Sequence, residues 1–341
     1  MITAGMWGLL SLAAARFGDR QGAIRLIDDE VPFHSITVKL PFTTKAIRVV
    51  PGVATAAWWD NVAAMKWEPG TWRAFNQEIT SGMRYIGFGE WVGVTGLFAA
   101  QRASEAILMD ADPFVYKELK RNVDANAAQF RVVLDTRCIS DKKGYINMRA
   151  NGGSGSSTVD IDHARGSDFK NVTVSCTTLP LLLAEYGWID NMGDVFIKID
   201  TEGAESVIVP TLREMLKGSK QLPTIFLSMH DMSNAAQRGA IADVLNLYPY
   251  YAVIPGRNSN VALETFVDDC SYGVKVRANT NGKRFVADNV CSWCDYLLVA
   301  SNANSLAKCG SHANGLRLQN EAFDAINDGN VTKYDYDKFP V

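Results

Sequence analysis

The stretch Val195-Phe196-Ile197-Lys198-Ile199-Asp200-Thr201-Glu202-Gly203-Ala204-Glu205 decides the fold class of this chain. It begins as a short apolar run rich in β-branched side chains, which predicts a buried strand. It then changes abruptly to acids and glycine. A buried parallel strand that ends in acids places them at the carboxyl edge of a sheet, where ligands bind in open α/β folds. The sequence therefore predicts an α/β protein whose chemistry lies at this edge.

The composition indicates one large globular domain or two modest ones. The 341 residues are 47% hydrophobic and 21% charged, which is ordinary for a protein with a real core. Lys and Arg together number 34 against 37 for Asp and Glu, so the net charge is -3. No basic surface for a polyanion is indicated, and we expect no nucleic-acid partner.

No membrane span is expected, because no stretch reaches the roughly 18 apolar residues that one needs. Residues 1–15 are apolar but lack the basic segment that begins a secretory signal. They also fit an ordinary amphipathic helix. We therefore expect a cytoplasmic protein, with the secretory pathway as the alternative if residues 1–15 act as a signal or anchor.

The first 80 residues are predicted to form a helix, a hairpin and a tryptophan-rich cap. Residues 33–40 and 46–50 alternate like two strands joined by a polar turn. Thr71 is predicted as the N-cap of a helix that runs to about Thr80. Four tryptophans either line a substrate entrance or pack this layer onto the sheet: Trp58, Trp59, Trp67 and Trp72.

A glycine-rich turn follows the first strand of the predicted sheet. Tyr85-Ile86 runs into Gly87-Phe88-Gly89-Glu90-Trp91-Val92-Gly93, and Leu97–Ala100 continues as a helix. This order lets the backbone approach a nucleotide and presents the free N–H groups of a helix N-terminus. The spacing G-x-G-x-x-x-G is wider than the dinucleotide fingerprint, and no Tyr-x-x-x-Lys hydride-transfer set is obvious. A nicotinamide-dependent oxidoreductase is therefore a disfavoured alternative.

An acid ends the next predicted strand. Asp110 follows residues 106–109, and a carboxylate at this position can accept hydrogen bonds from both hydroxyls of a ribose. A helix cap or a surface turn is the structural alternative for Asp110 alone. Asp112-Pro113 then opens a helix over 114–126. A third strand over 131–134 leads to Ile139 and Ser140, where an adenine could lie.

The rest of the chain continues the alternation of strands and helices. The loop 151–158 is either a lid over the site or an inert excursion, and Pro210 should kink its helix or mark a restart. His230 and Asp231 follow a buried strand, as Asp200 does. The remaining predicted elements are strands over 145–148, 172–176, 224–229, 251–254 and 295–300, and helices over 179–186, 204–216 and 235–247.

The six cysteines are too sparse for a disulfide scaffold at this length. Cys291-x-x-Cys294 followed by Cys309-x-x-His312 resembles a zinc pattern. The predicted strand over 295–300 begins directly after Cys294. This placement favours free or paired cysteines at a strand edge over a zinc knuckle.

Several of these segments together resemble one family. Ile197–Glu205 is similar to the hallmark IKID-x-EGAE of the FkbM-type methyltransferases, and Tyr85–Gly93 and Asp110–Pro113 resemble two further motifs. The resemblance covers about residues 66–301. It implies a class I Rossmann-like fold, with a mostly parallel twisted sheet flanked by helices and an N-terminal helix and hairpin extension. It also implies S-adenosylmethionine as methyl donor and O-methylation of hydroxyls on sugars, glycans or glycosylated metabolites.

The resemblance suggests domain limits and a cofactor site. We expect an N-terminal layer over 1–80, a methyltransferase domain over 81–305 and a C-terminal tail over 306–341. Family members usually carry Asp where this chain has Gly87, and that acid helps to hold the methionine end of the donor. Glu90 is a candidate substitute. The expected cofactor-binding set is Gly87, Gly89, Glu90, Trp91, Gly93, Thr95, Asp110, Ala111, Ile139, Ser140 and Asp200.

A sugar hydroxyl is a poor nucleophile, so a general base or a metal should assist the transfer. Asp200 or His230 is predicted to act as the base, with Glu202 orienting the acceptor hydroxyl. Glu205 is expected to stabilise the N-terminus of its helix. Asp200, Glu202 and Asp231 could also hold Mg²⁺ or Mn²⁺, although we do not expect a metal. A catalytically degenerate module that binds a glycan or a partner is the second alternative.

Overall fold

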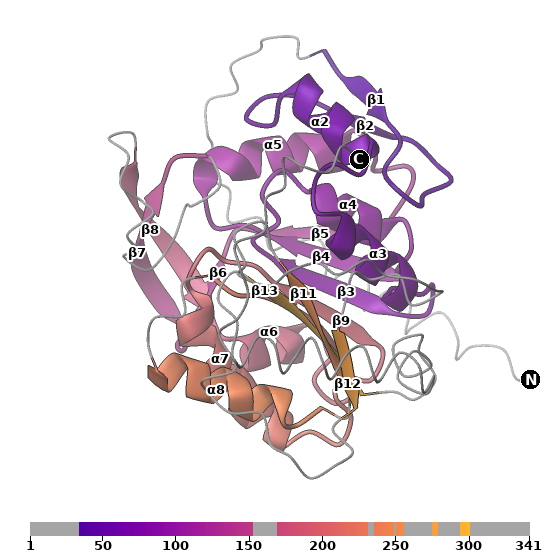
Figure 1. Cartoon of the computed structure of the whole chain (residues 1–341). Coiled ribbons are helices and arrows are strands. Elements are labelled where there is room, and N and C mark those ends of the chain that lie inside the picture. Colours follow the sequence, from indigo (N-terminus) through magenta and orange to yellow (C-terminus); the bar gives the residue numbers. More distant parts are fainter. Residues whose placement is uncertain are drawn as a thin grey trace, which may run out of the picture. The chain divides into compact units, whose positions relative to one another are not determined.

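An eight-stranded sheet forms the centre of the structure, in the strand order β12-β11-β13-β10-β9-β3-β4-β5 (Figure 1). The computed structural model describes residues 34–152, 169–230, 235–248, 250–255, 275–278 and 294–300. The strands of this sheet are β3 (Arg84–Phe88), β4 (Glu105–Met109), β5 (Val132–Asp135), β9 (Val195–Ile199), β10 (Thr224–Ser228), β11 (Tyr250–Pro255), β12 (Lys275–Ala278) and β13 (Cys294–Val299).

Five neighbouring strands of this sheet, β5, β4, β3, β9 and β10, are parallel. β13 lies between β10 and β11 and is antiparallel to both. A dinucleotide-binding sheet has the order 3-2-1-4-5-6 without such an inserted strand. The predicted mostly parallel Rossmann-like sheet is confirmed, and its carboxyl edge brings the ends of β3, β4, β9 and β10 together. β12 was not predicted.

The alternation of side chains along each strand gives the sheet two apolar faces. On β9, Ile197 and Ile199 pack with α6 (Leu179–Glu185), α7 (Glu205–Lys217) and α8 (Ala235–Leu245). Phe196 points to the other face, where it joins the layer of α2 (Ala56–Ala63), α3 (Pro69–Glu78) and α4 (Val94–Ala100). Figure 1 shows the two helix layers on opposite sides of the strands. Lys198, two residues from Phe196, belongs to the face of the N-terminal layer.

The predicted N-terminal hairpin is confirmed as β1 (Ile36–Val38) and β2 (Ile47–Val49), which pair antiparallel. One helix, α5 (Pro113–Asp124), holds its second strand and the following loop. Asn122 Oδ1 accepts the Val50 N–H at 2.7 Å, and its Nδ2 donates to the Val92 carbonyl at 2.9 Å. Glu118 accepts the Val53 N–H one turn earlier, at 2.6 Å. Side chains of α5 therefore satisfy backbone groups that a neighbouring strand would otherwise bind.

Asn122→Ala should lower the free energy of unfolding by about 2–4 kcal/mol. The substitution leaves a buried donor and a buried acceptor without partners, and each such group costs about 1–3 kcal/mol. Urea unfolding followed by tryptophan fluorescence measures the change. Asp124→Ala is the matched control, because this exposed residue on the same helix pairs with Lys120 at the surface and should change stability by less than about 1 kcal/mol. Equal losses in both variants would contradict the role of Asn122.

The predicted N-cap at Thr71 is wrong. α3 begins at Pro69, and Glu68 occupies the cap position with φ 42° and ψ 57°. Proline fits the first turn because its missing N–H has no intrahelical partner there. Thr71 lies inside the helix, where its hydroxyl donates to Glu68 Oε2 at 3.1 Å.

Pro210 was predicted to kink its helix or mark a restart, and the restart does not occur. α7 is one continuous helix from Glu205 to Lys217. Proline removes one backbone donor, but the buried residues Ile208, Val209 and Leu212 on either side hold the helix against the sheet. Tertiary packing therefore outweighs the local cost of proline.

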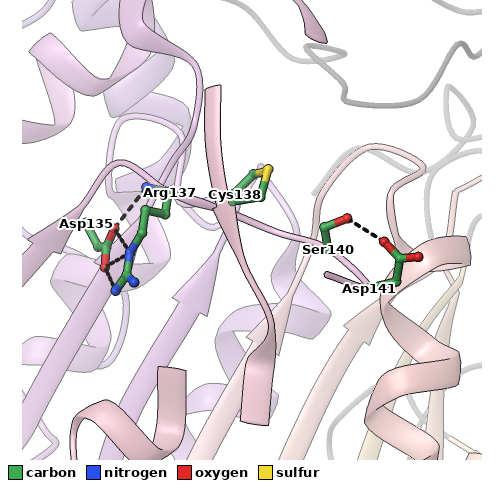
Figure 2. The surroundings of a disulfide bond; sticks show 6 residues. Asp135, Arg137, Cys138, Ser140 and Asp141 are labelled. Carbon is green, nitrogen blue, oxygen red and sulfur yellow. Dashed lines mark hydrogen bonds and ion pairs between the residues drawn. A yellow bond between two sulfur atoms is a disulfide. The ribbon is translucent and has the colours of Figure 1, made fainter. Parts of the chain in front are cut away.

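A second, three-stranded sheet has the order β6-β8-β7 and a disulfide that the sequence analysis did not predict. Its strands are β6 (Cys138–Ile139), β7 (Gly144–Ala150) and β8 (Lys170–Thr177). Cys138 and Cys176 are register partners on β6 and β8, which brings their sulfurs together. Figure 2 shows Cys138 between the Asp135–Arg137 ion pair and the Ser140–Asp141 hydrogen bond.

Several predictions lie outside the described residues. These are the N-terminal helix, most of the loop 151–158, Asp231, the C-terminal tail, and Cys291, Cys309 and His312 of the suggested zinc pattern. The predicted domain limits stay predictions. Across the described segments, no helix combines the length and apolarity required to cross a bilayer.

Candidate active site

Glu205 organises the acidic turn that follows β9. This first residue of α7 is fully buried. Its Oε1 accepts the Thr201 N–H at 2.7 Å and its Oε2 accepts the Gly203 N–H at 2.8 Å. Between them Glu202 adopts a left-handed φ of 52°, which only a well-held turn maintains in a non-glycine residue. Glu205 therefore holds the turn before α7, whereas the role predicted for it was to stabilise the N-terminus of that helix.

His230 follows β10 and lies among three acids. Its Nδ1 is 3.3 Å from Glu205 Oε1, and its Nε2 is 3.6 Å from Glu202 Oε2 and 3.7 Å from Asp200 Oδ1. Burial alone would lower the pKa of His230, but the hydrogen bond to Glu205 and the charges of Glu205, Asp200 and Glu202 raise it to about 10. An imidazolium has no free lone pair for a proton, so the arrangement disfavours His230 as the base. It is instead the cation that holds these acids together.

Lys198 joins the acidic turn to the glycine turn. Its Nζ donates to the Gly89 carbonyl at 2.8 Å and lies 3.1 Å from Asp200 Oδ2. Only 4% of its side chain is exposed. Burial by itself would lower the pKa of Lys198, yet the charges of Asp200 and Glu90 raise it well above its ordinary value. The ammonium therefore stays charged and fixes Asp200 beside the glycine turn.

Gly87 and Glu90 share one buried volume. A Cβ built on Gly87 would lie 1.6 Å from Glu90 Oε1, so the carboxylate of Glu90 occupies the space of a residue-87 side chain. Glu90 is 1% exposed and accepts hydrogen bonds from Tyr85 Oη at 2.6 Å and Thr95 Oγ1 at 3.2 Å. Gly87 is the register partner of Lys198. The chain therefore supplies a carboxylate beside Lys198 from position 90.

The glycine turn closes around Asp110 at the end of β4. Asp110 Oδ2 accepts the Trp91 N–H at 2.8 Å, and Oδ1 accepts the Asp112 N–H at 2.9 Å. Each carboxylate oxygen has a second lone pair, which leaves acceptors for the hydroxyls of a ribose. Burial raises the pKa of Asp110 to about 7, against the opposing effect of these two N–H bonds. Gly89 and Gly93 have φ of 72° and 90°, as a tight turn requires.

The remaining residues predicted for the cofactor lie around this turn in different ways. Thr95 is buried, and its hydroxyl donates to Glu90 Oε2, so it stabilises the carboxylate of Glu90 within the turn. Ala111 follows Asp110 and packs against the second sheet. Ile139 is buried, and Ser140 binds the Thr177 carbonyl through its N–H at 2.9 Å. Ile139 at the end of β6 and Ser140 directly after it therefore lie at the strand pair that the disulfide joins.

The four tryptophans divide into two groups. Trp59 and Trp72 are fully buried in the core of the N-terminal layer. Trp58 and Trp67 are half-buried, with ring centroids 5.4 Å apart, and Trp58 lies 4.9 Å from Trp91 in an edge-to-face contact. Trp59 and Trp72 therefore pack the N-terminal layer, which is one of the two roles predicted for the four tryptophans. The other two connect it to the glycine turn through Trp91.

Two charged residues at this edge, Lys198 and Asp295, were not predicted as part of the site. Asp295, on β13, is the register partner of Ser228 and accepts its hydroxyl at 2.7 Å. Burial and the charge of Asp200 raise the pKa of Asp295 to about 7. A lysine inside an apolar strand was the one visible signal, because a buried lysine needs an acidic partner. The position of Asp295 depends on how β13 is placed in the sheet.

No group of three or more His, Cys, Asp or Glu side chains that could hold a metal is present in the part of the chain that the structure describes. Asp200, Glu202 and His230 do meet at one edge, as the strand ends predicted. The carboxylate oxygens of Asp200 and Glu202 face the His230 ring, and Asp200 also pairs with the Lys198 ammonium. The suggested third metal ligand, Asp231, lies outside the described residues.

Residues 81–252, half of the chain, match the family model of the methyltransferase FkbM domain. The chain belongs to the FkbM methyltransferase family. The match spans the sheet from β3 to β11, including the glycine turn, Asp110 and the acidic turn. The family is one of S-adenosylmethionine-dependent methyltransferases.

Solved structures with a similar arrangement share little sequence with this FkbM-family chain. An FkbM methyltransferase from Methylobacillus flagellatus is 12% identical over 44% of this chain and 33% of that one, with a TM-score of 0.30. An O-methyltransferase from Thermotoga maritima is 10% identical over 78% of both chains (TM-score 0.33). A putative methyltransferase from Streptococcus mutans is 10% identical over 80% and 56% (TM-score 0.37). The first match spans a third of its relative, so the family assignment depends on the domain match alone. No curated protein matches the chain.

The residues present fit S-adenosylmethionine. Asp110 keeps free lone pairs for ribose hydroxyls and lies beside a turn of left-handed residues that ends at the start of α4. Ile139 and Ser140 lie near the end of β5, where they would contact an adenine. Asp200 and Glu90 would place negative charge beside the methionine end. When bound, the sulfonium donor supplies an electrophilic methyl group.

Proposed function

We propose that this protein is an O-methyltransferase that acts on a hydroxyl of a sugar, a glycan or a glycosylated metabolite. The observation that carries the proposal is the bridge made by Lys198, whose ammonium contacts both the Gly89 carbonyl and Asp200. It fixes a carboxylate beside the predicted donor turn. Carboxylate oxygens accept hydrogen bonds and suit a hydroxyl acceptor. The net charge of -3 supports a small or glycan acceptor over a nucleic acid.

The residues at the edge of the sheet supply position and electrostatics. Methyl transfer needs the acceptor oxygen in line with the methyl carbon, and correct positioning lowers such a barrier by several kcal/mol. Asp200, held by Lys198, and Glu202, on the strained turn, are proposed to accept hydrogen bonds from the acceptor. His230 stays protonated and keeps both acids in place.

Two alternatives differ from this proposal in class. A degenerate module that only binds a glycan or a partner draws its support from Gly87, where the family usually carries an acid. The placement of the Glu90 carboxylate in the space of that residue weakens this support. A nicotinamide-dependent oxidoreductase is disfavoured by the antiparallel strand β13 inserted between β10 and β11.

Calorimetry with S-adenosylhomocysteine tests the proposal first. We expect a dissociation constant in the micromolar range, about -8 kcal/mol at 1 μM. Mass spectrometry of the source organism's glycans, incubated with isotope-labelled donor, should then show the gain of one labelled methyl group. Absence of binding would favour the degenerate module. Labelling of a nitrogen or carbon atom would overturn the O-methylation.

Asp110→Asn should weaken S-adenosylhomocysteine binding by about 10–100-fold, because one acceptor oxygen is replaced by a donor and hydrogen bonds to a charged group contribute about 1.5–3 kcal/mol. The wild-type affinity should rise with pH through about 7, since the carboxylate form of Asp110 accepts both ribose hydroxyls and its raised pKa keeps it protonated below that pH. Calorimetry between pH 6 and 8 measures both effects. Asp124→Asn, at an exposed acid on α5, is the matched control, and a pH dependence that persists in Asp110→Asn would contradict the assignment.

A further inference from the structure

Asp295 is the second residue of β13, so it lies inside the sheet and not in a loop. The strand pairs with β10 on one side and with β11 on the other, where the register partners of Asp295 are Ser228 and Ile254. Ladders on both sides therefore hold its backbone in place. A functional side chain on such a rigid element keeps a more precise position than one on a loop.

The side chain of Asp295 lies on the same face of the sheet as Lys198. Side chains alternate along a strand, so Asp295 shares a face with Leu297, which packs in the core of the N-terminal layer. Lys198 shares a face with Phe196 of the same core. On β10, between these two strands, the Ser228 hydroxyl donates to Asp295 Oδ1 at 2.7 Å. One face of the sheet therefore carries the lysine, the serine and this second acid.

Asp200 and Asp295 lie on either side of the end of β10. Leu227 of β10 is the register partner of Ile199, and the residues that follow them are Ser228 and Asp200. Neighbouring strands lie about 4.8 Å apart, which places the backbones of β9 and β13 roughly 10 Å apart. The serine between them has a short side chain, and water reaches both acids, of which Asp200 is 28% exposed and Asp295 half-buried. This separation suits two carboxylates that contact one ligand from opposite sides.

Asp295 differs from Asp200 in the groups that hold it. Asp200 contacts two cations, Lys198 at 3.1 Å and His230 at 3.7 Å, and a proton on Asp200 would disrupt both pairs. Asp295 Oδ1 accepts from the neutral hydroxyl of Ser228, and among the described residues its Oδ2 has no hydrogen-bond partner. Asp295 can therefore take up a proton without breaking an ion pair.

We propose that Asp295 is a catalytic residue, the general base that takes the proton of the acceptor hydroxyl; this inference rests on the proposed function. As the acceptor oxygen forms its bond to the methyl carbon, the carbon–sulfur bond breaks and its electron pair stays on sulfur. The O–H bond of the acceptor breaks, and its proton passes to Asp295 Oδ2. The products are a methyl ether, a neutral thioether and a neutral carboxylic acid, which returns its proton to water. Asp200, on the other side, accepts a hydrogen bond and keeps its charge.

The test follows the transfer of an isotope-labelled methyl group from S-adenosylmethionine to a glycan extract of the source organism, catalysed by the full-length protein. Asp295→Asn should lower the initial labelling rate at saturating donor by about 100-fold or more, which is the usual contribution of a general base. Its affinity for S-adenosylhomocysteine should stay within about twofold of the wild type, because the lost group acts on the acceptor. The unfolding temperature should stay the same or rise, since the amide oxygen still accepts the Ser228 hydroxyl and the repulsion from Asp200 is removed.

Ser228→Ala tests the base through the residue that positions it. The serine hydroxyl favours the charged form of Asp295, so its removal should raise the pKa of that carboxyl above the value of about 7. A base must be deprotonated, so the wild-type labelling rate at saturating donor should rise with pH through about 7 and the rise should move to higher pH in Ser228→Ala. The other charged groups that act on Asp295 are unchanged in this variant: Lys198, Asp200, His230 and Glu68.

Two further variants complete the test. Asp295→Glu keeps a carboxylate and should label at least about tenfold faster than Asp295→Asn. Asp124→Asn, at an exposed acid on α5, should label like the wild type. The inference alone is overturned if Asp295→Asn labels at the wild-type rate, if Asp295→Glu is no faster than Asp295→Asn, or if the rise with pH does not move in Ser228→Ala. Loss of S-adenosylhomocysteine binding in Asp295→Asn would assign the residue a structural role and overturn it as well. Wild-type protein that labels no glycan overturns the proposed function.

Discussion

Gly87→Asp should abolish measurable binding of S-adenosylhomocysteine, and adding Glu90→Ala should restore it. A side chain at position 87 would enter the volume that holds Glu90 Oε1, 1.6 Å from the Gly87 Cβ position, and would approach Tyr85 Oη at 2.7 Å. Two carboxylates forced into one buried space repel each other, and the clash displaces the strand or the turn. In the double variant a single carboxylate again lies beside Lys198. Calorimetry and thermal unfolding of the four proteins measure affinity and folding together.

The single substitutions are needed to interpret the binding of the double variant. Glu90→Ala alone should weaken binding by about 10-fold or more, because it removes a charge beside Lys198 and leaves the buried Tyr85 hydroxyl without its acceptor. Gly82→Asp, at an open exposed position before β3, is the control. If Gly87→Asp alone binds as well as the wild type, the two positions do not share one volume and the interpretation of Glu90 is wrong.

Lys198→Met should cost about 3–5 kcal/mol of folding free energy and remove methyl transfer. The substitution keeps the apolar stem but leaves Asp200 and Glu90 without their buried counter-charge. Breaking a buried pair from one side has a cost of this size. It also releases the Gly89 carbonyl, so the glycine turn loses its link to β9. Urea unfolding and S-adenosylhomocysteine calorimetry report the two losses separately.

Lys198→Arg tests whether a positive charge alone is sufficient, because it keeps the cation but changes the shape of the charged group. It retains a cation, but a planar guanidinium in the place of a compact ammonium disturbs both contacts. We expect it to recover part of the stability and little of the affinity. The surface variant Lys217→Met, which removes an exposed pair with Glu214, should change stability by less than about 1 kcal/mol. Similar stabilities for Lys198→Met and Lys217→Met would contradict a stabilising role for the buried ion pair between Lys198 and Asp200.

The sequence predicted the sheet well because its strands carry local signals. Buried parallel strands are short apolar runs, and the parallel strands that end in Asp110 and Asp200 had to bring these acids to one edge. His230 followed from the same argument. The Thr71 cap failed because a local preference for threonine was weighed without Pro69, which fixes the first turn of α3 two residues earlier.

The rest of the site depends on topology that no local signal reveals. Asp295 reaches the edge because β13 inserts antiparallel between β10 and β11, so the start of this strand meets the end of β10. Side chains of α5 likewise anchor the N-terminal layer through Val50 and Val53, which no local pattern predicts. The disulfide depends on the register of β6 and β8, since 38 residues separate its cysteines. Contacts of this kind emerge only once the chain is folded.

That disulfide bears on where the protein matures. A bridge between buried cysteines persists in an oxidising compartment, whereas thioredoxin and glutathione keep cysteines reduced in most cytosols. Cys138 directly precedes Ile139 and Ser140, the residues expected beside the adenine. Protein produced in a reducing host would therefore differ from oxidised protein at the strand pair where the adenine is expected to bind. Preparations made for the binding experiments should be defined by their thiol content before affinities are compared.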